Sequence, residues 1–180
     1  MRKFERSILQ AGYEAELEYL STVDEREYLK NYGPVEELKF KDDQKEEARQ
    51  AVRNTQKRID NVGPSEPETE FADDLFIKVA EELKLEDYFK LKFYTAVNSH
   101  LDKDFGEDAF FDLDIGDNKT ITVSLDLKTN LEEGKKADIT INVPSPEHYL
   151  ITRKENSKEY WEIIIEAAKK ITKQFKNQIN

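Results

Sequence analysis

The sequence contains no cysteine, which excludes disulfide bonds and zinc sites built from thiolates. Its six glycines form no glycine-rich loop, so a P-loop and a dinucleotide-binding fingerprint are excluded as well. No apolar run approaches the length of a transmembrane helix, and the first residues lack the apolar stretch of a signal peptide. We therefore expect a protein of the cytoplasm that has no membrane partner.

Charged residues make up 37% of the 180 residues, the same share as hydrophobic residues, and the formal net charge is -11. The low apolar share predicts that part of the chain lies outside a packed core. Residues 71–147 are the most acidic region, with 18 acidic side chains against nine lysines. An acidic surface repels the phosphate backbone of nucleic acids unless cations lie between the two. A nucleic-acid function would therefore require a bound cation.

Residues 1–62 are predicted to form a helical arm or hairpin. Apolar residues at three- and four-residue spacings favour a helix from Met1 to about Tyr32, and the following Gly33-Pro34 stops it. A second helix is predicted to begin at a cap, Asp42 or Asp43, and to run to about residue 59. It has few apolar side chains, which predicts a solvated spacer. We expect the arm to serve self-association or the binding of a protein partner.

Residues 63–70 are rich in proline and acidic side chains, and they predict a linker before a domain over residues 71–180. Periodicity in this domain predicts a helix, a strand, a hairpin, another strand and a closing helix. The predicted elements are a helix over 71–83, a strand over 91–97, a hairpin over 106–129, a strand over 136–143, and a helix that begins at an Asn156–Glu159 capping box. This order predicts an α+β layer fold, also describable as an α/β layer, with an N-terminal helical arm.

The two strands of the hairpin each have one apolar face, formed by the odd-numbered residues. A two-residue turn at Asp117-Asn118 would pair Gly116 with Lys119 and mix leucine and aspartate on each face. The hydrophobic pattern therefore predicts a loop of three or five residues instead. Such a loop keeps the apolar residues of both strands on one side of the sheet.

The same register places Asp108 directly opposite Asp126, with Lys128 two residues along on the same face. Two carboxylates across a strand pair lie about 4.5–5.5 Å apart at Cβ and repel each other unless a cation or a proton lies between them. Oxygen ligands at this separation suit a hard divalent ion such as Mg²⁺ or Mn²⁺. A lysine beside the ion can orient an attacking water or neutralise charge that develops on a phosphoryl group.

The hairpin resembles the core of the PD-(D/E)xK nuclease superfamily, in which an Asp on one strand is followed on the next strand by Asp or Glu, any residue, and Lys. Asp108 matches the first position, and Asp126-Leu127-Lys128 matches the triplet. The resemblance covers residues 71–175 and implies a restriction-endonuclease-like sheet flanked by helices. It also implies metal ligation by Asp108, Asp126 and the Leu127 carbonyl, with catalytic support from Lys128.

In that superfamily a glutamate on the preceding helix often completes the metal site, and Glu82 or Glu81 is the candidate here. The implied function is Mg²⁺- or Mn²⁺-dependent hydrolysis of DNA. Triplets of an acid, any residue and lysine occur six times in the sequence, but only Asp126 lies on an alternating apolar strand with a second Asp opposite. This context distinguishes the triplet at Asp126 from the others.

Several alternatives stay open at the level of the sequence. The even-numbered face of the hairpin can be interpreted as a solvent-exposed surface of an antiparallel sheet. His100, Asp102 and Asp104 are interpreted as a polar loop before a strand, with an extension of the metal site as the alternative. The alternative functions are a non-catalytic protein-binding module that retains the nuclease fold, such as a phage or mobile-element accessory protein, and an acidic inhibitor that mimics DNA.

Overall fold

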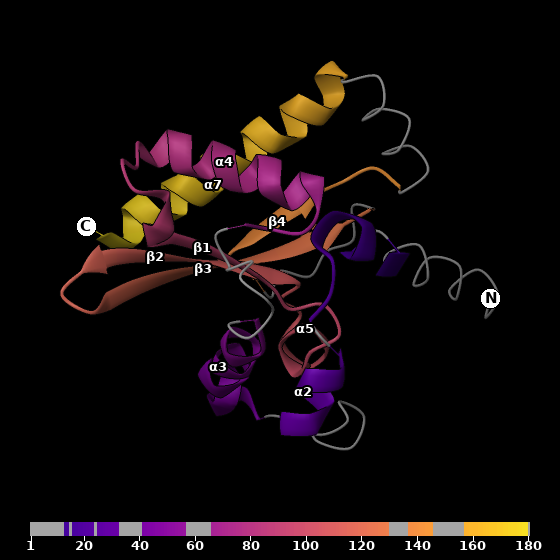
Figure 1. Ribbon diagram of the computed structural model, residues 1–180. Coiled ribbons are helices and arrows are strands. Elements are labelled where there is room, and N and C mark those ends of the chain that lie inside the picture. Colours follow the sequence, from indigo (N-terminus) through magenta and orange to yellow (C-terminus); the bar gives the residue numbers. More distant parts are fainter. Residues whose placement is uncertain are drawn as a thin grey trace.

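The computed structural model describes residues 13–14, 16–23, 25–32, 41–56, 66–129, 137–145 and 157–179. These residues form a four-stranded mixed sheet in the order β1-β2-β3-β4, flanked by helices (Figure 1). The strands are β1 (Leu91–Thr95), β2 (Ala109–Gly116), β3 (Lys119–Lys128) and β4 (Ile139–Asn142). Strands β1, β2 and β3 are antiparallel neighbours, and β4 pairs with β3 in parallel. The expected α+β architecture is confirmed, while the specific restriction-endonuclease-like fold stays a prediction.

One face of the sheet is covered by α4 (Glu70–Leu83) and α7 (Lys158–Ile179), which lie together above it in Figure 1. Odd-numbered strand residues such as Phe93, Phe111 and Leu125 are buried against these helices. Thr69 begins α4 by accepting a hydrogen bond from the backbone N–H of Ala72. The predicted helix over residues 71–83 and the predicted strands before and after the hairpin are confirmed within a few residues.

The opposite face is covered by α2 (Glu25–Tyr32), α3 (Lys45–Gln56) and α5 (His100–Phe105), which lie below the sheet in Figure 1. A smaller apolar cluster forms here around Tyr94 and Phe110, whose rings stack with centroids 4.9 Å apart. The interpretation of the even-numbered face as solvent-exposed is wrong for its central positions. Helices cover that face, and Phe110, Asp112, Ser124 and Asp126 are buried.

Helix α3 packs on this face although it has few apolar side chains. Ala48, Ala51 and Val52 are buried, and charged groups complete the contact. Arg53 reaches Asp112 on β2 through a two-pronged ion pair, in which Nε donates to Oδ2 at 2.8 Å and Nη2 to Oδ1 at 3.1 Å. The helix therefore contacts the sheet closely and is no solvated spacer. The proposed division into arm, linker and domain stays a prediction.

A second set of ion pairs fixes the other end of α3. Glu107 lies just before β2 and its side chain is fully buried. Its carboxylate forms ion pairs with Lys45 Nζ at 2.5 Å and with Arg49 Nη2 at 2.8 Å. Burial of an unpaired carboxylate would be costly, so the two cations make this position possible. Lys45, Arg49 and Arg53 are spaced four residues apart, which places all three on one side of the helix.

The N-terminal helix differs from its prediction. Residues 16–20 are helical, but the helix is interrupted at residues 21–23, where Ser21 has a φ of 64°, and α2 begins only at Glu25. A continuous helix up to Tyr32 is therefore wrong, although α2 ends at Tyr32 as expected. The second helix is preceded by a 3-10 turn over Asp42–Gln44, so neither predicted aspartate is its N-cap. Asn156 lies outside the described residues.

The turn of the hairpin also differs from its prediction. Gly116 pairs with Lys119 across a two-residue turn, and both central residues, Asp117 and Asn118, have positive φ. A bulge between Asp114 and Gly116 then shifts the register by one residue. The loop prediction was therefore wrong, but the register beyond the bulge is the expected one, because the extra residue restores the apolar side chains to one face.

No helix in the described part of the chain has both the length and the apolar character that crossing a bilayer requires.

Candidate functional site

Asp108 lies immediately before β2, at the end of the hairpin away from the turn. Its neighbour Ala109 pairs with Leu125, which is the last paired position of β2 and β3 at this end, so a direct pairing of Asp108 with Asp126 stays a prediction. The backbone N–H of Asp108 donates to the Leu125 carbonyl at 2.9 Å. Its carboxylate accepts from the backbone N–H of Leu127 at 2.6 Å, so the side chain extends the β2–β3 ladder by one hydrogen bond. Only 3% of the residue is exposed.

The side chains of Asp126 and Lys128 lie side by side on one face of β3. The Lys128 Nζ is 3.5 Å from Asp126 Oδ2, and both side chains are largely buried. Leu127 lies between them and points to the apolar core on the other face. In an antiparallel ladder, the N–H and C=O of one residue point to the same side of the strand. The Leu127 carbonyl therefore faces the same side of β3 as its N–H, which contacts Asp108.

Two further carboxylates meet Asp108. Glu16, from the helical segment at residues 16–20, and Asp102, from α5, each offer a ligand oxygen, and the three ligand atoms all lie within 4.8 Å of one another. Oxygens bound to one Mg²⁺ or Mn²⁺ ion, each at about 2.0–2.2 Å from it, can be no farther apart than about 4.4 Å, and Ca²⁺ allows slightly more. The group thus has the donor type and nearly the spacing that a divalent ion needs.

Burial raises the pKa of the three carboxyl groups in this cluster. Burial is the main cause that raises the pKa of Asp108 to about 8, followed by the charge of Glu16. Burial and the charges of Asp102 and Asp126 raise the pKa of Glu16 to about 7. The pKa of Asp102 is raised as well, again mainly by burial. The charge of Asp126 raises the pKa of all three carboxyl groups, so the four acids act as one electrostatic unit that a cation would stabilise.

The predicted glutamate ligand lies elsewhere. Glu82 and Glu81 are in the last turn of α4, which covers the other face of the sheet from Asp126, and neither belongs to the carboxylate group of the described residues. The interpretation of residues 100–104 as a loop is wrong, because they form α5. His100 is buried and its Nδ1 lies 2.8 Å from the Tyr28 hydroxyl, so it belongs to the packing of α2 against α5.

Sequence reasoning missed Glu16 and placed Asp102 only as an alternative. Glu16 belongs to the region interpreted as an arm, and it meets Asp108 only through tertiary contacts such as that of the Val23 N–H with the Val97 carbonyl at 3.2 Å. Asp102 carried a weak signal, because Ser99 is a capping residue three positions before it. Ser99 does accept hydrogen bonds from the N–H groups of Leu101 and Asp102, which fixes the start of α5.

Comparison of the chain with protein-family models, with curated proteins and with solved structures finds no significant match. The assignment of function therefore rests on the geometry of the chain itself.

Proposed function

We propose that this protein is a metal-dependent phosphodiesterase that cleaves DNA, with its site at the end of the hairpin marked by Asp108 and Asp126. The observation that carries the proposal is the group of three carboxylates from separate segments, the buried Asp108 with the half-buried Glu16 and Asp102. The Asp126–Lys128 pair lies on the neighbouring strand. Buried carboxylates repel one another and lose hydration, so a cluster of this kind is costly unless a cation or protons compensate it.

The residues divide into two roles. Asp108, Asp102 and Glu16, together with Asp126 and the Leu127 carbonyl, would hold Mg²⁺ or Mn²⁺. A bound ion of this kind supplies Lewis-acid activation of water and neutralises charge on the phosphodiester. Lys128 adds one positive charge 3.5 Å from Asp126, where it can donate a hydrogen bond to a phosphate oxygen or hold the attacking water.

The acidic character of the chain is consistent with this role if the ion and the substrate bind together. With a net charge of -11, the protein repels a phosphate backbone at long range, and the divalent cation provides the local attraction that the side chains lack. Binding of DNA should therefore depend steeply on the divalent ion as well as on salt.

The test uses the full-length protein with plasmid and single-stranded DNA in Mg²⁺ or Mn²⁺. We expect cleavage that falls at least a hundredfold in Asp108→Asn, Asp126→Asn and Lys128→Met, in line with the loss of a metal ligand or of an electrostatic group. Asp114→Asn is the matched control, because Asp114 lies on β2 but is exposed and outside the carboxylate group. Its activity should equal that of the wild type.

A direct measurement of ion binding complements the cleavage assay. Titration calorimetry with Mn²⁺ should show one saturable site that Glu16→Gln and Asp102→Asn weaken and that Asp114→Asn does not. Cleavage that survives Asp126→Asn, or failure to bind Mn²⁺ at all, would contradict the proposal. Binding of Mn²⁺ without cleavage of any DNA would favour the non-catalytic protein-binding module.

A further inference from the structure

Asn98 lies in the turn between β1 and α5, and its backbone has a φ of 69°. This left-handed conformation is uncommon for residues with a side chain, although asparagine adopts it more often than most. Glycine would adopt it without steric cost. The backbone of the turn therefore does not require an asparagine, and the contacts of the side chain give the reason for its presence.

The side-chain amide of Asn98 ties the turn to the segment that carries Glu16. Its Nδ2 donates to the Tyr13 hydroxyl at 3.0 Å and to Thr22 Oγ1 at 3.1 Å. Tyr13 precedes Glu16 by three residues and Thr22 follows it by six, so the two hydrogen bonds flank this glutamate in the chain. The Thr22 hydroxyl in turn donates to the Val97 carbonyl at 3.0 Å, which adds a second link between the segment and the turn.

The backbone of the same turn reaches the other two carboxylates of the cluster. The N–H of Asn98 donates to Asp102 Oδ2 at 3.0 Å, which holds this carboxylate in the first turn of α5. The N–H of Ala96 donates to the Asp108 carbonyl at 2.7 Å. Residues 96–98 thus contact the segments of all three acids that meet in the cluster, although the turn itself contains no acid.

We propose that Asn98 is a positioning residue for the divalent ion. Its side chain holds the segment of Glu16, and its backbone N–H holds the carboxylate of Asp102, so that both acids stay within reach of one ion. The inference rests on the proposed function, because it takes the carboxylate cluster to be an ion site. Residues that orient metal ligands without touching the metal typically change its affinity by 10–100-fold when they are removed. Asn98 acts in this way, by limiting the positions that Glu16 can adopt.

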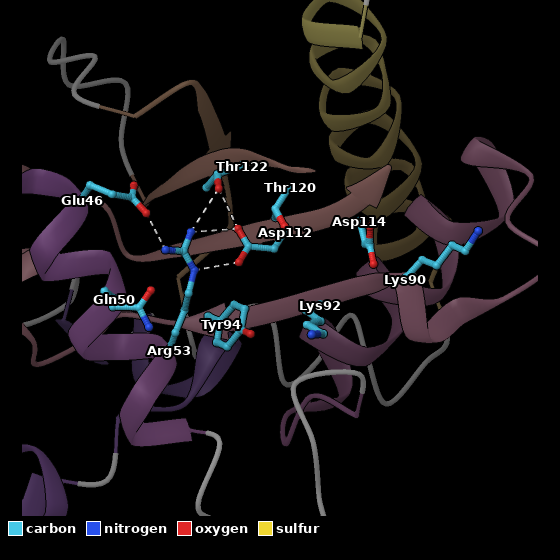
Figure 2. Close-up of a pocket in the computed structure, with 10 residues that line it drawn as sticks. All are labelled: Glu46, Gln50, Arg53, Lys90, Lys92, Tyr94, Asp112, Asp114, Thr120 and Thr122. Carbon is cyan, nitrogen blue, oxygen red and sulfur yellow. Dashed lines mark hydrogen bonds and ion pairs between the residues drawn. The ribbon is translucent and has the colours of Figure 1, made fainter. Parts of the chain in front are cut away.

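A cavity on the same face of the sheet supplies a control for this role. It has a volume of about 430 Å³, lies between α3 and the strands β1, β2 and β3, and is lined in part by Tyr94 and Asp112 (Figure 2). Thr122 donates there to Asp112 Oδ1 at 2.7 Å. Asp112 lies four residues after Asp108, or about 13 Å at the rise of an extended strand. Thr122→Val therefore removes a hydroxyl contact like that of Thr22, but away from the cluster.

The experiment measures Mn²⁺ affinity by electron paramagnetic resonance, which detects the ion free in solution, with the full-length protein and no DNA. Asn98→Gly keeps the left-handed backbone and the N–H that contacts Asp102 but removes the amide, and it should weaken Mn²⁺ binding about tenfold. Thr22→Val should weaken it severalfold. Asn118→Gly, the same change at a positive φ in the hairpin turn, should leave the affinity unchanged, as should Thr122→Val.

A double substitution separates the positioning of Glu16 from a general loss of structure. Glu16→Gln by itself weakens Mn²⁺ binding, and adding Asn98→Gly to it should cause little further loss, because the amide acts through Glu16. A merely structural role would lower the affinity by the same factor in both backgrounds. Thr22→Val in the same two backgrounds repeats the comparison without altering the turn itself.

Two outcomes would overturn the inference, namely an unchanged Mn²⁺ affinity in Asn98→Gly and an equal loss with and without Glu16. Failure of the nuclease proposal gives a different result. Mn²⁺ binding that depends on Asn98, without cleavage of DNA, removes the activity and leaves the positioning role. Cleavage of DNA with a Mn²⁺ affinity that does not depend on Asn98 does the reverse, and a wild-type protein that binds no Mn²⁺ overturns both.

Discussion

The two faces of the sheet are built on different chemistry. Among the described residues, 25 buried side chains form the apolar cluster beneath α4 and α7, whereas ten form the cluster beneath α2, α3 and α5. The second face compensates with ion pairs, through which Glu107 and Asp112 hold α3. The carboxylate cluster and the cavity that Tyr94 and Asp112 line both belong to the second face.

The difference shows where a small domain can place polar chemistry. The face beneath α4 and α7 supplies the stability that comes from removing apolar area from water. The other face can then contain buried acids, although their burial costs free energy. A site rich in charge is thus accommodated by a sheet whose opposite side is apolar.

The largest expected effect comes from Phe111→Ala, compared with Phe110→Ala. The two residues are neighbours on β2, both are fully buried, and they point to opposite faces. Phe111→Ala should cost about 4 kcal/mol in the free energy of unfolding, and Phe110→Ala somewhat less, because fewer apolar groups surround it. Chemical denaturation measures both. A larger loss in Phe110→Ala would reverse the assignment of the main core.

Arg53→Met tests whether charges hold α3 on the sheet. The substitution keeps the apolar stem but leaves the buried Asp112 without its cation, which should cost about 2–3 kcal/mol. Adding Asp112→Leu to it should restore part of that loss, because no unpaired acid is then left. Lys169→Met on α7 is the control and should be neutral. A loss below about 0.5 kcal/mol in Arg53→Met would show that the ion pair does not fix the helix.

The pH dependence of stability tests the carboxylate cluster. The pKa values of Glu16 and Asp108 are raised in the folded protein from 4.5 and 3.8 to about 7 and 8, so the folded state binds more protons than the unfolded state between about pH 4 and 8. Stability without divalent ions should therefore fall as the pH rises through this window, by at least about 1 kcal/mol, or about 2–4 °C in Tm. Thermal unfolding between pH 5 and 8.5 measures it.

Asp108→Asn serves as the control for this pH dependence, because it removes the most strongly shifted group and should flatten the slope. Addition of Mn²⁺ should raise the Tm more at pH 8.5 than at pH 5, since the ion competes with protons for the same oxygens. A Tm that rises with pH in the absence of metal would contradict the electrostatic picture of the cluster.

The smallest expected effect is a gain in stability from Asn118→Gly in the hairpin turn that joins β2 to β3. Asp117 and Asn118 have φ values of 52° and 56°, which glycine adopts without the steric cost of a Cβ. We expect the free energy of unfolding to rise by a few tenths of a kcal/mol. Chemical denaturation, with Asn118→Val as the opposing variant, measures the change. Destabilisation by glycine would mean that the turn differs from the type described.

Much of the hairpin could be predicted from the sequence because alternation of apolar residues is a local signal. It predicted the odd-numbered core face and the register of the paired residues from Ala109 to Asp114, both of which the strand pairing bears out. The pairing of Asp108 with Asp126 lies beyond the last paired position and stays a prediction. It did not predict the bulge at Ile115, since a tight turn with a bulge and a longer loop give the same register. The strands at 91–95 and 139–142 followed from the same kind of pattern.

The role of the N-terminal region could not be predicted in the same way. Helix α3 looks like a solvated helix because the residues that attach it are charged, and their partners lie 58 or more residues away in the sequence. Glu16 gave no signal of its own among the many acids of the chain. Its position beside Asp108 depends on how the segment up to Val23 packs against the residues that follow β1.

The sequence by itself determined the periodic elements and the pairing of β2 with β3, because the segregation of apolar residues to one face depends only on residues close in the chain. The tertiary structure alone decided that helices cover the polar face, that Glu16 and Asp102 join Asp108, and that Tyr94 faces a cavity. Those contacts join charged and polar groups that are distant in the sequence, and such groups have no periodicity that would mark them as partners.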